Sequence, residues 1–375
     1  MKNSFFFLFA ILPVLVIAQI PGKTKNVFII TTDGFRWQEV FTGADSSLIN
    51  NTAFVKDTSL IKEQFWDNDP LERRKKLMPF FWSVIAQKGQ LYGNRRYNNF
   101  VNAKNWYKFS YPGYNEIFTG FADPIPILNR PVNNTNNNVL EFLNNSLEYK
   151  GKVVAFTSWN LFPYILNKDR NGLLVNSGYQ NMDETVLDNV FELLNSMQDN
   201  IASKGNTRFD ELTFLNAMEY IKLNKPHIVF IGLGETDEFA HSSRYDLYLE
   251  QASKVDKMIS ELWYFIQTNA EYKDNSTIII TTDHGRGAKS SNWNSHHLLI
   301  PGSGQTWFAV LGSGCSPLGE IKTAGQLYQN QLAATISWLA DKQFESRHRI
   351  GARVIIPSNN LSVKSNTGYP VSARK

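Results

Sequence analysis

Five stretches of the chain are mostly apolar, rich in Val, Ile and Phe, and end at small or polar residues. They cover residues 26–32, 152–156, 226–232, 276–282 and 306–312. Unbroken runs of this kind are typical of strands that are buried on both faces of a parallel sheet. Between them, apolar residues recur with helical spacing over 184–197, 210–223 and 245–264. The pattern predicts an α/β fold: a three-layer sandwich with a mostly parallel central sheet flanked by helices.

Further elements are indicated by capping residues and by local composition. Residues 69–72, Asp-Pro-Leu-Glu, form a strong helix start. We expect this helix to reach residue 86, with a kink or a restart at Pro79. A closing helix is expected over 327–339, and a short strand over 353–356.

The first 18 residues have the form of a signal peptide. Lys2 precedes an apolar run over residues 5–17, and small residues lead up to Gln19. The run is about 13 residues long, which is short for a membrane span. We therefore expect cleavage, no stable membrane anchor afterwards, and a periplasmic or secreted protein. No linker divides residues 19–375, which are expected to form a single domain.

Composition narrows the functional class only slightly. The chain has 375 residues, of which 42% are hydrophobic, and can bury a large core. Its net charge of +4 is too small to indicate a nucleic-acid partner, and no basic cluster is interleaved with aromatic residues. The single cysteine, Cys315, cannot form an intramolecular disulfide, and no His stands beside it to activate a thiol nucleophile. The sequence does not indicate an oligomeric state.

Side chains suited to metal binding follow three of the predicted strands. Asp33 follows the first stretch, and Asp283 and His284 follow the fourth, each after Ile-Ile-Thr-Thr. Asp237 and His241 follow the third and are four residues apart, so one helical turn puts both on one face. A single Asp at a strand end is often only a helix cap. Because the carboxyl ends of parallel strands meet at one edge of a sheet, we expect the repeated residues to converge there.

Two other features complete this set. His296 and His297 lie in a loop rich in Gly, Ser and Asn, and Ser110 begins a helix-like stretch where the free N–H groups favour an anion. Three carboxylates, three imidazoles and a hydroxyl suffice for two metal ions. Mixed His and carboxylate donors suit Zn²⁺, with Mn²⁺ or Fe as alternatives. Two such ions suit in-line displacement at phosphorus, and one of them would activate the serine.

These motifs resemble the alkaline phosphatase superfamily, in particular its nucleotide pyrophosphatase/phosphodiesterases and the related phosphomonoesterases. The resemblance extends from about residue 25 to about residue 340 and keeps the family's motif order. It is carried by Asp33-Gly34, Ser110-Tyr-Pro-Gly-Tyr-Asn-Glu-Ile-Phe-Thr-Gly, Asp237-x-x-x-His241, Asp283-His284-Gly285 and the late histidine.

The resemblance implies a role for each of these residues. One zinc would be held by Asp33, Asp283, His284 and the Ser110 oxygen, and the other by Asp237, His241 and His296, with His297 as the alternative. Ser110 would be the nucleophile and would form a phosphoseryl intermediate. The branch usually has Thr at this position, and the change is chemically mild.

Contacts to the substrate are also implied by the resemblance. Asn129 would hold a phosphoryl oxygen, with Asn133 or Asn134 as alternatives. Lys168 and Arg170 are similar to the cation pair of the family's phosphomonoesterases, and a dianionic monoester gains from such cations. We therefore expect an exported hydrolase of small phosphate esters that favours monoesters, with phosphodiesterase or nucleotide pyrophosphatase activity on the same site as the alternative.

Three other functions compete with this interpretation. The superfamily's sulfatases begin their site with Ser or Cys, x, Pro, x, Arg, and here Tyr114 stands in place of the Arg. Their single Ca²⁺ also does not call for three histidines. A phosphotransferring mutase is usually cytosolic, which the signal peptide opposes. A non-catalytic protein that binds phosphorylated ligands is disfavoured by the complete set of ligands.

Overall fold

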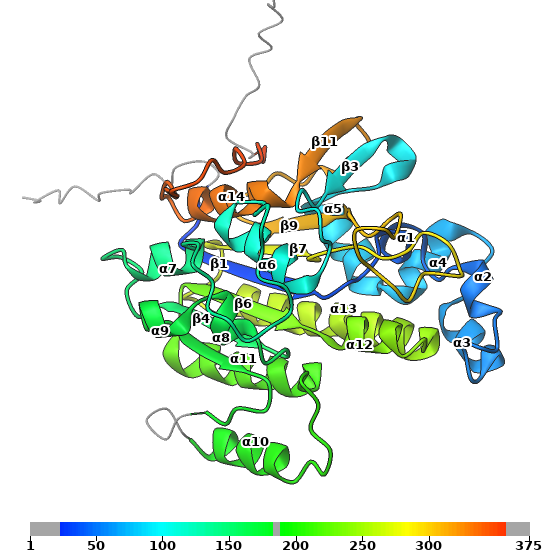
Figure 1. Ribbon diagram of the computed structural model, residues 1–375, viewed down its shortest axis with the longest axis horizontal. Helices are drawn as coiled ribbons and strands as arrows, with labels where there is room; N and C mark the ends of the chain where they lie inside the picture. The colour runs from blue at the N-terminus through cyan, green and yellow to red at the C-terminus, as the bar shows by residue number, and fades with distance from the viewer. Residues whose placement is uncertain (1–22, 183–187, 358–375) are drawn as a thin grey trace, which may run out of the picture.

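The computed structural model describes residues 23–182 and 188–357 (Figure 1). The predicted signal peptide, residues 1–18, and the start of the predicted helix at 184–197 lie outside the described residues. In the described ranges, no helix is both long enough and apolar enough to cross a membrane. The single domain expected over 19–375 stays a prediction.

Eight strands form the central sheet, in the order β10-β2-β9-β7-β1-β6-β4-β5. They are β1 (Asn26–Thr32), β2 (Gly89–Tyr92), β4 (Val153–Thr157), β5 (Leu174–Ser177), β6 (Ile228–Leu233), β7 (Ser276–Thr281), β9 (Phe308–Gly312) and β10 (Gly319–Glu320). The neighbours β7, β1, β6, β4 and β5 run parallel, and β9 is antiparallel to β7 and β2. The predicted mostly parallel α/β sheet is confirmed. A small second sheet has the order β11 (Gly325–Tyr328), β3 (Asn99–Asn102), β8 (Gln305–Thr306).

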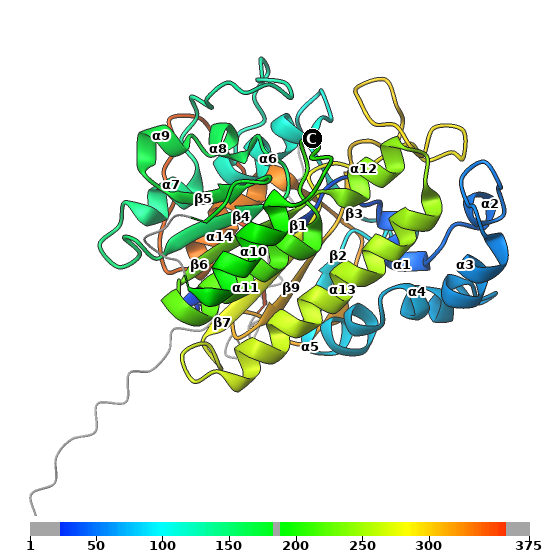
Figure 2. The same ribbon diagram turned by 90° about the horizontal axis from the view of Figure 1, so that it is seen from below.

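Helices cover both faces of the central sheet. They are α1 (Trp37–Thr42), α2 (Ser46–Ile49), α3 (Thr58–Phe65), α4 (Pro70–Leu77), α5 (Ala86–Lys88), α6 (Ser110–Thr119), α7 (Val139–Asn144), α8 (Phe162–Ile165), α9 (Lys168–Asn171), α10 (Asn189–Asp199), α11 (Asp210–Asn224), α12 (Glu235–His241), α13 (Tyr245–Thr268) and α14 (Leu332–Leu339). Figure 2 shows α11 and α13 running across one face of the sheet.

The three layers follow from the alternation of side chains along the strands. In β1, Phe28 and Ile30 belong to the core that also contains apolar residues of α11 and α13. Val27 and Ile29 point to the opposite face and belong to the core formed with α6, α7 and α14. Because both faces are buried, the strand needs apolar residues at every position, which is the pattern that the sequence shows.

Several predicted elements differ from the structure. The stretch at 306–312 is divided at Trp307, whose indole N–H donates to the Phe35 carbonyl at 2.9 Å, and its main part is antiparallel rather than parallel. The closing helix, expected over 327–339, starts only at Leu332, because residues 325–328 pair with β3 instead. Residues 353–356 form no strand among the described residues.

The helix predicted over 69–86 is also interrupted. Asp69 caps α4 as expected, with its carboxylate accepting from the Leu71 N–H at 2.9 Å. The helix ends at Leu77, before Pro79, and a π-helix over Phe81–Ile85 follows. Proline removes an N–H and clashes with the preceding turn, which accounts for the break.

Candidate active site

Three neighbouring strands bring the predicted ligands to one edge of the sheet. In the β7-β1-β6 group, Thr31 lies opposite Thr281 and Thr32 lies opposite Leu233. Asp33 and Asp283 therefore extend from adjacent strand ends. Helix α12 begins directly after β6 and carries Asp237 and His241 to the same edge.

The first group of donors, which we call the buried half, consists of Asp33, Asp283 and His284. One ligand atom from each residue lies within 4.8 Å of the others. The His284 Nε2 atom is 3.3 Å from Asp33 Oδ1 and 3.4 Å from Asp283 Oδ2. The side chains of Asp283 and His284 are fully buried. This is the geometry of a compact cation site closed off from solvent.

Neutral hydrogen bonds orient the buried half. Asp283 Oδ1 accepts from the Gly34 N–H at 3.0 Å, and Asp33 Oδ2 accepts from the Tyr114 hydroxyl at 3.1 Å. His284 Nδ1 lies 2.9 Å from the Gly285 carbonyl, which can only accept, so Nδ1 carries the proton and Nε2 keeps a free lone pair. Asp283 Oδ2 is buried without a hydrogen-bond partner. A buried oxygen left in this state fits a metal ligand.

Ser110 is held against the buried half by the start of α6. Its Oγ is 3.4 Å from Asp33 Oδ1 and 3.3 Å from His284 Nε2. The close approach depends on Gly113, because a Cβ there would lie 2.7 Å from the backbone oxygen of Asp283. Gly34 is similarly required: its φ is +59° and a Cβ would lie 2.7 Å from Asp237 Oδ1.

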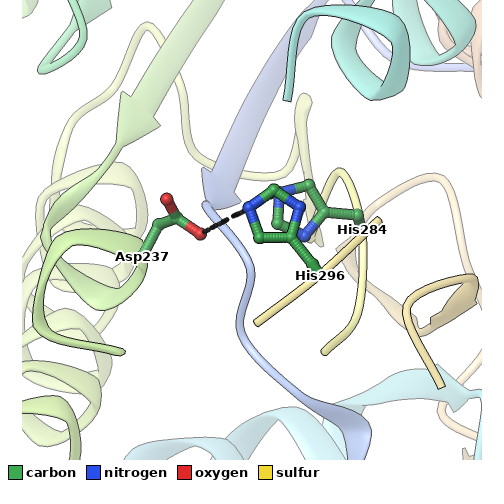
Figure 3. A group of neighbouring side chains, drawn as sticks. All are labelled: Asp237, His284 and His296. Carbon is green, nitrogen blue, oxygen red and sulfur yellow. Dashed lines mark ion pairs between the residues drawn. The ribbon is translucent and has the colours of Figure 1, made fainter. Parts of the chain in front are cut away.

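The second group, which we call the rim half, consists of Asp237, His241 and His296. Asp237 Oδ2 is 3.1 Å from His241 Nε2, and Asp237 Oδ1 is 3.7 Å from His296 Nε2. His296 Nδ1 lies 2.7 Å from the Lys108 carbonyl, so its Nε2 also keeps the lone pair. Figure 3 shows the His296 ring stacked on that of His284, with centroids 3.8 Å apart, and Asp237 facing them.

His296 rather than His297 enters the cluster. The neighbouring His297 accepts a hydrogen bond from the Leu299 N–H at 3.1 Å through Nδ1 and belongs to a turn of the loop. The structure therefore brings together all seven residues to which the resemblance gave a ligand role, and the histidine of the loop is His296 rather than the alternative His297.

Electrostatics separate the two halves. Burial, reinforced by the charge of Asp237, raises the pKa of Asp33, and burial together with Asp33 raises the pKa of Asp283. Burial would also raise the pKa of Asp237, but the Arg286 guanidinium and His241 hold it well below its usual range. Crowded buried carboxylates repel one another unless a cation neutralises them. The donor set of carboxylates and imidazoles fits divalent transition metals such as Zn²⁺.

Two residues of the site were not found from the sequence. Arg286 forms an ion pair with Asp237, and Tyr114 donates to Asp33. The only available signal was position, since Arg286 directly follows Asp-His-Gly and Tyr114 lies one helical turn after Ser110. Sequence spacing does not show which way these side chains point.

Asn129 lies beside the nucleophile, as expected. Its Oδ1 accepts from the N–H of Tyr111, the residue after Ser110, at 3.0 Å. The alternatives are engaged elsewhere: Asn133 donates to Asp169 and Asn134 donates to Asn115. Asn129 also lines a cleft of about 540 Å³, whose lining includes neither Ser110 nor the carboxylate and histidine donors. It is lined by uncharged residues, namely Asn129, Pro131, Trp159, Asn160, Leu161, Tyr164 and Asn206.

The structure does not bring Lys168 and Arg170 to this cluster. Both belong to α9, which precedes β5 and so lies toward the amino ends of the strands, next to α7 in Figure 1. The Arg170 guanidinium forms an ion pair with Glu141 at 2.6 Å and donates to the Asn136 carbonyl. Their expected contact with the substrate therefore has no geometric basis here.

Three solved structures share the fold with this chain at low sequence identity. The wild-type alkaline phosphatase PafA superposes with a TM-score of 0.57 at 10% identity, over 90% of this chain and 99% of that one. The phosphonate monoester hydrolase of Agrobacterium radiobacter gives 0.51 at 11% identity, over 88% and 76% of the two chains. The lipoteichoic acid synthase LtaP from Listeria monocytogenes gives 0.50 at 12% identity, over 87% and 74%. No curated protein matches the sequence.

A sequence-based family model identifies the family of the chain more narrowly than these distant structures do. The model for type I phosphodiesterases and nucleotide pyrophosphatases matches residues 45–299, which is more than half of the chain. The matched region contains Ser110, Asn129, α12, β7 and the loop with His296. The chain therefore belongs to the type I phosphodiesterase/nucleotide pyrophosphatase family, within the alkaline phosphatase superfamily of phosphate and sulfate ester hydrolases.

Proposed function

We propose that this protein hydrolyses phosphate esters with two bound divalent metal ions, mainly Zn²⁺, and with Ser110 as the nucleophile. The observation that carries the proposal is the position of the Ser110 oxygen, 3.3 Å from His284 Nε2 and 3.4 Å from Asp33 Oδ1 at the first residue of α6. A serine that only capped the helix would have no reason to face two buried metal-type donors.

The reaction proceeds through two successive displacements at phosphorus, the first by Ser110 and the second by water. The Ser110 oxygen forms a bond to phosphorus while the bond to the leaving alcohol breaks, which gives a phosphoseryl group and an alcohol that takes up a proton. Water then attacks the same phosphorus, releasing the phosphate product and restoring the Ser110 hydroxyl. The metal ions, when bound, lower the pKa of the attacking hydroxyl and stabilise the charge on the leaving oxygen.

Several groups position the substrate for these steps. In the first turn of α6, the Tyr111 N–H is bound by Asn129 and Pro112 has no N–H, so the Ser110 N–H is the backbone donor left beside the nucleophile for a charged phosphoryl oxygen. Asn129 accepts from this helix end through Oδ1, which leaves its NH₂ group available as a donor, and the residue also lines the cleft. Asp33 is braced by Tyr114 and keeps its other oxygen toward Ser110.

The cleft favours phosphodiesters, including nucleotide pyrophosphates, over monoesters. Its lining carries no charge, and Trp159 and Tyr164 offer aromatic surface for an organic group. A monoester dianion would gain from cations, but Arg170 is paired with Glu141 away from the cleft. This reverses the preference inferred from the sequence, which rested on Lys168 and Arg170.

We also propose that the protein is exported, because residues 1–18 have the pattern of a signal peptide. Its substrate would then lie outside the cytoplasm.

The test is a rate panel on the zinc-loaded mature protein with aryl phosphodiester, phosphomonoester, phosphonate monoester and sulfate substrates. We expect the diester rate to dominate. Ser110→Ala should lower turnover by at least about 10³-fold with both metals retained, and Ser110→Thr should restore much of it. A dominant monoester rate would overturn the diester preference. Near-normal turnover by Ser110→Ala would exclude this nucleophile, and a purified protein without transition metal would exclude the metal-dependent mechanism.

A further inference from the structure

Arg286 is a buried cation inside the rim half of the site. Its side chain is fully buried, and its Nη2 forms an ion pair with Asp237 Oδ1. Burying a guanidinium is costly unless it is paired and hydrogen-bonded, so its position is specified by its partners.

Backbone groups fix the guanidinium in place. Nη1 donates to the Asn294 carbonyl at 2.9 Å, and Nη2 donates to the Asp237 carbonyl at 3.3 Å. Its Nε is buried without a hydrogen-bond partner among the described residues. A planar, always charged group held in this way acts as a fixed charge rather than as a mobile surface cation.

The two carboxylate oxygens of Asp237 have different partners. Oδ1 is bound by Arg286, whereas Oδ2 lies 3.1 Å from His241 Nε2. The carboxylate can therefore offer one oxygen freely to a metal ion at the rim half. Among the described residues, no such arginine ion pair reaches the buried half: Asp33 and Asp283 receive neutral hydrogen bonds from Tyr114 and from the Gly34 N–H, and the Arg286 charge acts on Asp33 without an ion pair between them.

We propose that Arg286 makes the two metal positions unequal, weakening divalent-ion binding at the rim half while it holds Asp237 in its ligand orientation. The inference rests on the proposed two-metal function. The physical reason is Coulombic: a fixed positive charge in contact with a ligand opposes a second cation on the same carboxylate, and burial leaves the repulsion poorly screened. Arg286 is thus a positioning residue that sets the relative occupancy of the site.

The experiment is a zinc titration of the full mature protein against a chromophoric chelator. For the wild type we expect two dissociation constants that differ by at least about tenfold, because the fixed charge is in direct contact with a ligand of the rim half only. Arg286→Met removes the charge and should tighten the weaker constant by about tenfold or more. Arg286→Lys keeps the charge and should stay within about threefold of the wild type. Arg244→Gln, which breaks an Arg–Asp pair with Asp246 outside the cluster, is the control and should change neither constant.

The outcomes separate the inference from the function on which it rests. Two zinc ions with equal wild-type constants, or an Arg286→Met variant with an unchanged or weaker second constant, would overturn the role of Arg286 and leave the two-metal function intact. Failure of the wild type to bind zinc would overturn both. If Arg286→Met does not fold, His241→Ala decides the question: it should abolish the weaker constant, and loss of the stronger one contradicts the inference.

Discussion

The two halves of the site use the same kinds of ligand in different surroundings. Asp283 and His284 of the buried half are fully buried, whereas His241 of the rim half has a side chain that is 48% exposed. The buried half extends from the ends of β1 and β7, and the rim half is carried by a single helix and a long loop. Strand ends fixed by ladder hydrogen bonds hold ligands more rigidly than loops do.

The difference has an electrostatic consequence. In the buried half, burial raises the pKa values of Asp33 and Asp283, reinforced by the charge of Asp237 on the first and of Asp33 on the second, so an incoming cation relieves an unfavourable arrangement. In the rim half, Arg286 already neutralises Asp237, and the pKa of that carboxyl is held low. The carboxylates of the buried half thus lack a compensating cation in direct contact in the absence of a metal ion, whereas the carboxylate of the rim half is already compensated by Arg286.

The largest effect is expected for Asp283→Asn. Loss of this charge from the fully buried half should remove the metal bound there and lower turnover by at least about 10³-fold. Elemental analysis and kcat measure the two effects. Asp274→Asn, at the opposite end of β7 and exposed, should keep metal content and rate. Equal losses in both variants would contradict a specific role for Asp283.

A smaller effect is expected in the rim half for His296→Ala. It removes one of the three donors there and should lower turnover by about 10²-fold, with loss of one ion per chain while the ion in the buried half is kept. His297→Ala, one residue away in the same loop, should leave both quantities close to wild type. If His297→Ala loses the ion and His296→Ala keeps it, the geometry of this loop is wrong.

Gly113→Ala tests the packing of α6 against the buried half without touching a ligand. The new Cβ would lie 2.7 Å from the Asp283 carbonyl oxygen and should displace Ser110. We expect a loss of about 10- to 100-fold in kcat and about 1–3 kcal/mol in the free energy of unfolding, with metal content unchanged. Gly325→Ala, where a Cβ meets nothing within 4 Å, is the matched control. Unchanged kcat in Gly113→Ala would show that the helix adjusts freely.

The smallest predicted effect is a pH dependence of stability that arises at the start of α12, the helix that carries Asp237 and His241. Burial and the nearby Asp210 raise the pKa of Glu235, at the start of α12, to about 8. A folded-state pKa above the unfolded value means that stability is full at low pH and is lost as pH rises through about 8. The free energy of unfolding of the metal-free protein, measured with urea, should therefore fall between about pH 5 and about pH 9. The fall should be about 1–3 kcal/mol larger in the wild type than in Glu235→Gln. Glu238→Gln, exposed on the same helix, should keep the wild-type slope.

Part of the fold and of the site could be read from local pattern. The apolar run at 26–32 matches β1, because a strand buried on both faces requires apolar residues throughout. The run at 306–312 was equally clear, but its direction was not, since an apolar sequence is the same for parallel and antiparallel pairing. Short strands such as β10 and β11 carry no such pattern and were missed.

The sequence by itself determined the donors that follow the strands: Asp33, Asp237 and Asp283 lie at one edge because parallel strands share a direction. The tertiary structure alone decided the contacts made by loops and long side chains. It places His296, which the resemblance had already favoured over His297, beside Asp237, pairs Arg286 with Asp237, and pairs Arg170 with Glu141 at the other end of the sheet. The physical reason is that strand direction is a local property carried along the backbone. The aim of a loop histidine or an arginine depends instead on which distant partner can satisfy its hydrogen bonds and charge in the folded chain.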